Sequence, residues 1–135
     1  MFTLDSTLSV QEAKQFNPVV LAFVGDAVYS LYVREWLCFS TDYKTGELQK
    51  RTARIVSAHG QSEFLERLLP LFTEEETEIF KRGRNAKKGT KSKNASVSEY
   101  NRSTGFEAVF GFLYVTGQKE RLNELFQMLT QGENL

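Results

Sequence analysis

Two long apolar segments, each containing a single acidic residue, place the strongest constraint on the fold of this chain. The first, residues 19–33, reads VVLAFVGDAVYSLYV, and its only charged residue is Asp26. The second, residues 103–118, reads STGFEAVFGFLYVTGQ, and its only charged residue is Glu107. Both segments are predicted to form helices that are apolar nearly all round. Such helices are buried in a core or against a partner chain.

A lone carboxylate in a buried helix costs several kcal/mol unless it is paired, protonated or bound to a cation. Glycines accompany both acids: Gly25 lies in the first segment, and Gly105 and Gly111 lie in the second. Because glycine inside a helix costs about 1 kcal/mol relative to alanine, we expect a backbone or a ligand to approach closely there. Each acid then either pairs with a buried Arg or Tyr, or faces the other acid across a divalent cation. Two such acids in one chain favour the second interpretation.

The residue types available restrict the metal. Oxygen-only ligands suit Mg²⁺, with Mn²⁺ as a possible substitute. Zinc is disfavoured, because His59 and Cys38 are single residues that do not fall at ligand spacing. We expect Cys38 to be a small buried hydrophobe and His59 to cap a helix C-terminus. No Glu-x-x-His motif occurs, which argues against a di-iron site, and no organic cofactor is expected.

The net charge of zero hides a strongly basic segment. Between Lys81 and Arg102 there are eight Lys and Arg residues and one acid. A basic block on an otherwise acidic protein indicates a local anionic partner. Within it, residues 83–95, GRNAKKGTKSKNA, have the composition of an exposed loop. The glycine spacing in this loop does not match a nucleotide-binding P-loop.

A cation held by two carboxylates beside a basic loop favours phosphodiester hydrolysis. The metal would lower the pKa of a bound water, orient it for in-line attack and neutralise the leaving oxygen. The basic loop would hold a polyanion by its phosphates. Its candidate RNA-binding residues are Arg82, Arg84, Asn85, Lys87, Lys88, Lys91 and Lys93. A second basic group, Lys50, Arg51 and Arg54 on one helix, fits RNA contact and a solvated face equally well.

The rest of the chain predicts an all-α protein of about seven helices in one domain, residues 1–135. No strand-like alternation persists, whereas helix start and stop signals recur. These signals are the capping boxes Ser9-x-x-Glu12, Thr73-x-x-Glu76 and Ser96-x-x-Glu99, the Asn17-Pro18 start, a cap at Thr45 and a stop at Gly117. The longest apolar stretch is too short for a comfortable membrane span and carries Asp26. With no sign of a secretory signal, the cytoplasm is the expected location.

Several of these residues resemble the ribonuclease III family. Its motif around the first acid is similar to Phe23-Val24-Gly25-Asp26-Ala27-Val28, and its second to Phe106-Glu107-Ala108. Gly46-x-Leu48, Arg51 and Val56-Ser57 also occur where that family has similar residues. The basic stretch from Arg82 to Asn94 resembles the mini-ribonuclease III branch, in which the catalytic domain stands alone.

The resemblance implies a ribonuclease III-like helical endonuclease domain. It implies a homodimer that cuts double-stranded RNA with Mg²⁺, notably in the maturation of large-subunit (23S) ribosomal RNA precursor. By the family pattern, Asp26 and Glu107 are metal ligands and catalytic residues. Full-length ribonuclease III usually has two further acids, where this chain has Ala22 and Thr104, and the mini branch also lacks them. A two-carboxylate site leaves more metal positions to water or RNA phosphate, so the metal count stays open.

Two other functions are compatible with the same sequence. The first is a catalytically silent RNA-binding protein of this fold, such as a ribosome-associated accessory factor. Retention of both acids argues against it, because a pure RNA binder would gain by neutralising them. The second is a structural helical protein that oligomerises through its apolar helices. The sequence leaves open the cleavage sites, the substrate range and any help from ribosomal proteins.

Overall fold

The computed structural model describes residues 1–88 and 96–133. Seven α-helices and one short 3-10 helix occur in these residues, and none of these residues forms a strand. The helices are α1 (Val10–Lys14), α2 (Pro18–Ser40), α3 (Thr45–Val56), α4 (Ala58–Leu68), η1 (Leu69–Leu71), α5 (Glu74–Asn85), α6 (Val97–Val115) and α7 (Lys119–Gly132). The predicted all-α fold is confirmed, and so is the estimate of about seven helices.

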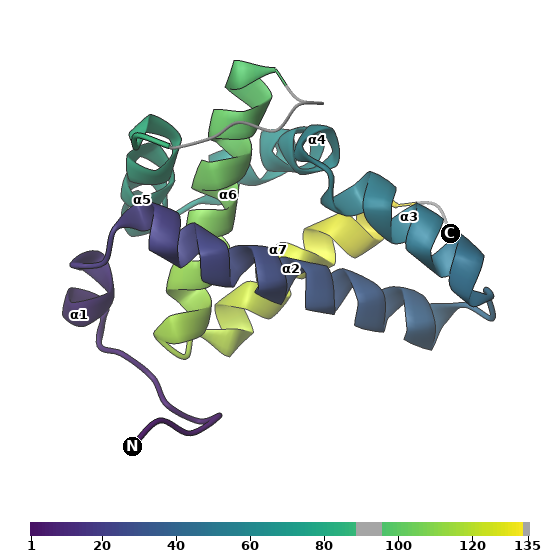
Figure 1. Cartoon of the computed structure of the whole chain (residues 1–135), viewed down its shortest axis with the longest axis horizontal. Coiled ribbons are helices and arrows are strands. Elements are labelled where there is room, and N and C mark those ends of the chain that lie inside the picture. The colour runs from purple at the N-terminus through teal and green to yellow at the C-terminus, as the bar shows by residue number, and fades with distance from the viewer. Residues whose placement is uncertain (89–95, 134–135) are drawn as a thin grey trace.

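The two apolar segments form the two longest helices, α2 and α6, which cross near the middle of the molecule (Figure 1). In the same view α5 lies beside α6, while α3 and α4 lie at the other side of the crossing. Contacts join α6 to α2, α5, α4 and α7, so it is the central helix of the fold. The prediction that these segments are buried therefore holds for α6, with Tyr114 as an exposed exception. One face of α2 stays exposed.

Glycines make the crossing close. A Cβ built on Gly25 of α2 would lie 1.7 Å from the carbonyl oxygen of Glu107 in α6. A Cβ on Gly111 would lie 1.8 Å from the carbonyl oxygen of Leu21. The two backbones touch, which explains why glycine is tolerated inside both helices despite its cost. Gly83 of α5 and Gly105 of α6 form a second close contact, since a Cβ on Gly83 would lie 2.9 Å from the Gly105 Cα.

An aromatic cluster fills the core beside this crossing. Tyr29, Phe64, Phe106 and Phe110 are all less than 2% exposed. The Tyr29 and Phe106 ring centroids are 4.9 Å apart and nearly perpendicular, an edge-to-face arrangement that favours aromatic packing. Because α2, α4 and α6 all contribute to this cluster, the positions of the three helices are mutually fixed.

The helix ends mostly follow the capping signals. Ser9 and Thr73 form reciprocal capping boxes with Glu12 and Glu76. Asn17 Oδ1 accepts from the Val19 amide, and Ser96 caps α6 through the Glu99 amide. Gly117, with φ of 74°, follows the last turn of α6 and supplies the left-handed conformation that ends a helix.

Three local predictions were wrong. Thr45 is the first residue of α3 and not its cap, since Lys44 occupies the cap position without a side-chain bond. Cys38 is exposed, because in the last turn of α2 the neighbouring Leu37 faces the core and Cys38 faces outward. His59 does not cap a C-terminus: Ser57 separates α3 from α4 and caps the latter, which places His59 in the first turn of α4. Among the described residues, no helix is long and apolar enough to cross a membrane.

Candidate functional site

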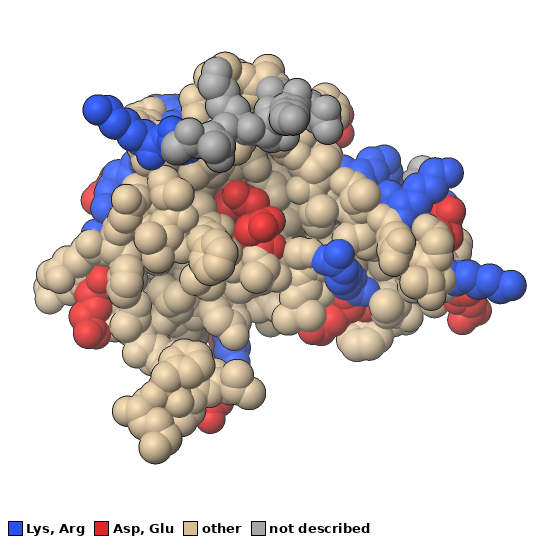
Figure 2. Space-filling view, in the orientation of Figure 1, with Lys and Arg blue, Asp and Glu red and all other residues tan. Residues whose placement is uncertain are grey.

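Asp26 and Glu107 meet where α2 crosses α6. The contact between Gly25 and the Glu107 carbonyl brings the next residue of α2, Asp26, against the Glu107 side chain. Asp26 is exposed and Glu107 is half-buried. In the orientation of Figure 1, acidic side chains lie in a recess near the middle of the molecule (Figure 2).

The environment of Glu107 favours its protonated form. Burial, together with the neighbouring Asp26 carboxylate, raises the pKa of Glu107 from 4.5 to about 8. Gln61 acts in the opposite direction, because its amide donates a hydrogen bond to Glu107 Oε2 at 3.2 Å. The partners of Glu107 are therefore Asp26 and Gln61. An arrangement in which each acid pairs with a buried Arg or Tyr is not found in the described residues.

Two facing carboxylates, one of them with a raised pKa, are a suitable site for a hard cation, which would replace the proton on Glu107 and relieve the repulsion. No group of three or more His, Cys, Asp or Glu that could hold a metal occurs in the described residues. The two positions that carry acids in full-length ribonuclease III hold buried Ala22 and Thr104, whose hydroxyl donates to the Tyr100 carbonyl at 3.0 Å. The donor set fits Mg²⁺ or Mn²⁺, provided that water or substrate completes the coordination.

Gln61 was not predicted from the sequence. It lies on α4, is 1% exposed, and accepts a hydrogen bond from Ser103 of α6. The available signal was its position on the core-facing stripe of α4, at helical spacing from Phe64, Leu65 and Leu68. A polar residue on such a stripe must find a buried partner.

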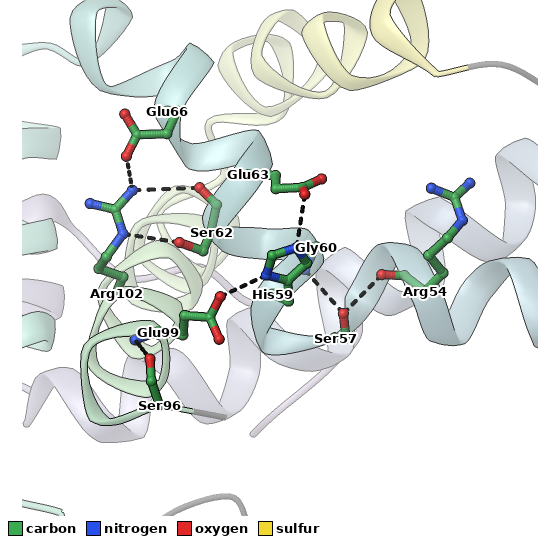
Figure 3. Close-up of polar contacts among 10 residues, drawn as sticks. All are labelled: Arg54, Ser57, His59, Gly60, Ser62, Glu63, Glu66, Ser96, Glu99 and Arg102. Carbon is green, nitrogen blue, oxygen red and sulfur yellow. Dashed lines mark hydrogen bonds and ion pairs between the residues drawn. The ribbon is translucent and has the colours of Figure 1, made fainter. Parts of the chain in front are cut away.

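The outer side of α4 is attached to α6 by a second set of polar contacts (Figure 3). The His59 ring lies between two carboxylates, with Nδ1 2.7 Å from Glu99 Oε2 and Nε2 2.8 Å from Glu63 Oε1. Hydrogen bonding to Glu99, and then the charge of Glu63, raises the pKa of His59. Arg102 of α6 donates to Ser62 and Glu66 of α4. These contacts hold the N-terminal half of α6 against α4.

The basic segment begins at the C-terminal end of α5, close to the acids. Gly83 packs on Gly105, two residues before Glu107. Arg84 donates to Asn85 and lies over the Phe80 ring, and Arg82 donates to the Phe16 carbonyl. Lys87 is exposed.

Lys88 has a local role at the end of α5. Its ammonium donates to the carbonyl oxygens of Arg84 and Ala86, at 3.1 and 2.8 Å, so it closes the C-terminus of the helix. Lys91 and Lys93, also predicted to bind RNA, lie outside the described residues. Through the contact of Gly83 with Gly105, the start of the basic segment lies near the two carboxylates.

The second basic group is partly engaged within the chain. Arg51 pairs with Glu47 at 2.9 Å, and its guanidinium lies over the Tyr43 ring. Arg54 pairs with Glu133 at 3.2 Å, while Lys50 is exposed. RNA contact by this group stays a prediction, and it would have to compete with these internal ion pairs.

Comparison with known proteins shows similarity over most of the chain. Residues 19–118 match the model of the ribonuclease III domain family. The chain is 40% identical over 129 residues to the mini-ribonuclease 3 of Clostridium tetani, covering 95% of this chain and 85% of the relative. It is 45% identical over 121 residues to that of Brevibacillus brevis, covering 87% and 90%. A solved structure of a Fusobacterium nucleatum protein has a TM-score of 0.81 at 28% identity and covers 89% of this chain and 96% of that one.

Proposed function

Because this chain belongs to the ribonuclease III family, whose members are endoribonucleases, we propose that it hydrolyses double-stranded RNA with the help of Mg²⁺ held by Asp26 and Glu107. The observation that carries the proposal is the meeting of these two carboxylates beside the start of the basic segment. We further propose that the substrate is structured RNA, such as a large-subunit (23S) ribosomal RNA precursor.

Each group would have a separate task in the reaction. Bound Mg²⁺ supplies an activated water and charge neutralisation at the leaving oxygen. Asp26 is exposed and so can offer carboxylate oxygens to a cation that enters from solvent. Glu107, held deeper by Gln61, would offer its carboxylate to the cation after losing the proton that its raised pKa retains. The basic segment binds phosphates of the RNA backbone, which positions the duplex without reading its sequence.

We also propose a homodimer. One face of α2 carries Val20, Phe23 and Leu31, which are 47%, 81% and 53% exposed. Their spacing puts them on one side of the helix, and Phe23 and Leu31 line an apolar depression that also includes Asp26 and Tyr114 of α6. A second copy related by a two-fold axis would cover this face and supply a second site for the other RNA strand.

The function is tested by incubating duplex RNA with wild-type protein and with Asp26→Asn, in Mg²⁺ and in EDTA. We expect wild-type protein to cut only with Mg²⁺ and Asp26→Asn not to cut, while keeping the helical spectrum of the folded protein. Asp42→Asn, the same change at an exposed residue beyond the end of α2, is the matched control and should cut normally. RNA binding without cleavage in Mg²⁺ would instead favour a silent binding protein.

A further inference from the structure

Gln61 connects three parts of the chain around the deeper carboxylate. Its Nε2 lies 3.2 Å from Glu107 Oε2 and 3.2 Å from the carbonyl oxygen of Val56, the last residue of α3. Its Oε1 accepts from the Ser103 hydroxyl of α6. A primary amide has two N–H donors, and here both are directed at acceptors.

The partners determine which way the amide faces. The Val56 carbonyl can only accept a hydrogen bond, so Nε2 and not Oε1 must face it. Ser103 then donates to Oε1 on the other side. Since the orientation is fixed by two groups other than Glu107, the remaining N–H is aimed at Glu107 before any cation binds.

The helix that carries Gln61 is itself held in place. On its outer side, α4 is joined to α6 through His59 and Glu99, and through Arg102 and two α4 residues (Figure 3). On its inner side Phe64 packs against Tyr29 and Phe106. The amide therefore has little freedom to follow a moving carboxylate, and it can instead hold that carboxylate still.

We propose that Gln61 is a positioning residue: it holds one oxygen of Glu107 so that the other is presented to the cation, and Ser103 fixes the amide that does so. The inference rests on the proposed function. It assigns to Gln61 the orientation of the Glu107 carboxylate, which neither acid can provide alone. A site with only two carboxylates has few ligands to orient the cation, so the orientation of each one matters more. Groups that orient metal ligands typically change affinity or activity about 10- to 100-fold when removed.

A merely structural role makes a different prediction. Gln61 also links α3, α4 and α6, so its loss will lower the melting temperature in either case. Only a positioning role requires weaker Mg²⁺ binding in protein that is still folded. The discriminating quantity is therefore the Mg²⁺ concentration that half-saturates the site, compared at temperatures where every variant is native.

The experiment uses Gln61→Met, which keeps length and approximate volume but removes both donors, and Ser103→Ala, a milder change that frees the amide to rotate. Mg²⁺ binding is measured without RNA by titration calorimetry, and kcat and KM for duplex RNA are measured across Mg²⁺ concentrations. Leu68→Ala, which leaves a cavity beside the same helix and away from the acids, is the control for lost stability.

We expect Gln61→Met to raise the half-saturating Mg²⁺ concentration about 10-fold or more, with KM for RNA unchanged at saturating Mg²⁺. Ser103→Ala should have a smaller effect in the same direction, and the two changes together should be little worse than Gln61→Met alone, because both act through one amide. Leu68→Ala should lower the melting temperature without changing the half-saturating concentration.

If Gln61→Met binds Mg²⁺ as tightly as wild-type protein does, and wild-type protein cleaves RNA, the inference is overturned and the proposed function stands. Wild-type protein that binds no Mg²⁺ and cuts no RNA would overturn both. If Gln61→Met does not fold, Ser103→Ala decides: an unchanged half-saturating concentration in that variant counts against the role.

Discussion

Unequal burial gives the two carboxylates at the crossing different properties. Asp26 is open to solvent, while Glu107 is half-buried, accepts a hydrogen bond from Gln61 and has a pKa raised to about 8. At neutral pH and without metal, the deeper acid therefore keeps its proton. A cation bound at the proposed site would have to displace that proton, so we expect metal binding to become more favourable toward higher pH.

The same pKa predicts how stability depends on pH in metal-free protein. Between about pH 4.5 and 8 the native state holds a proton on Glu107 that the unfolded state has released, so the free energy of unfolding falls as pH rises. Other groups aside, the slope is about 1.4 kcal/mol per pH unit, and it levels off above pH 8. Urea titrations in EDTA at several pH values measure it. Glu107→Gln, which cannot titrate, is the control, and equal pH dependence of the two proteins would contradict the assignment.

Charged residues of the site could be predicted from the sequence, whereas Gln61 could not. Asp26 and Glu107 stand out because each is the only charge in a long apolar segment. Burying a neutral amide among apolar residues costs less than burying a charge, so Gln61 does not stand out in the sequence. Its partners are identified only once α4 is packed on α6. Cys38 shows the opposite error: its residue type favours burial, yet it lies on the outward side of a turn whose core position is taken by Leu37.

At the scale of helices, the glycines where α2 crosses α6 determine the geometry of the site. Gly25 and Gly111 let α2 and α6 touch, and this contact is what brings Asp26 to Glu107. The sequence predicted a close approach at these glycines, because their helical cost needs a compensating contact. It did not indicate which backbone approaches, since that depends on the crossing of two elements about 80 residues apart.

Gly25→Ala should therefore disrupt both fold and site. The added Cβ meets the Glu107 carbonyl oxygen at 1.7 Å, so the helices must separate, at a cost of about 3 kcal/mol or more. Gly46→Ala is the matched control: nothing lies within 4 Å of its added Cβ, and the change should be neutral or stabilise α3 by up to about 1 kcal/mol. Urea unfolding measures both. A cost for Gly25→Ala no larger than for Gly46→Ala would show that the crossing is not close.

For the whole molecule, the exposed face of α2 is the feature that the fold leaves unexplained. The apolar character of both long helices predicted more buried surface than the chain itself provides, and α2 keeps Phe23 and Leu31 open to solvent. The sequence did not indicate which side of α2 stays open, because the all-round apolar pattern has no preferred face. A partner copy over that face would account for it.

The dimer is tested by the mass in solution. Light scattering of wild-type protein at micromolar concentration should give twice 15.5 kDa. Phe23→Ser with Leu31→Ser should give the monomer mass and lose most of the cleavage of both strands. Phe39→Ser, at an equally exposed position on α2 but outside this face, should remain dimeric. Monomeric wild-type protein with full activity would exclude the dimer.

For the whole molecule, charge-changing substitutions can separate the proposed RNA binding from the proposed cleavage. Changing Lys87, Lys88 and Lys91 to Glu should weaken RNA binding strongly, while the Mg²⁺ dependence of the residual cleavage stays the same. Each lost phosphate contact should flatten the log–log dependence of binding on salt by about 0.9 for a duplex like B-DNA. Because the Lys88 ammonium already binds the end of α5, we expect Lys88→Glu alone to contribute less than Lys87→Glu.

Binding constants at several salt concentrations measure these slopes. Lys119→Glu, the same charge change at the start of α7 and at the far end of α6 from the basic segment, is the control and should leave the slope unchanged. At saturating RNA the turnover of the triple variant should return to near the wild-type value. The lost contacts bind the substrate and the transition state equally, so the stabilisation of the transition state relative to bound substrate is kept. Asp26→Asn should do the reverse, with the slope kept and turnover lost. An unchanged slope in the triple variant would mean that RNA lies elsewhere, and Lys50, Arg51 and Arg54 would then be the next residues to change.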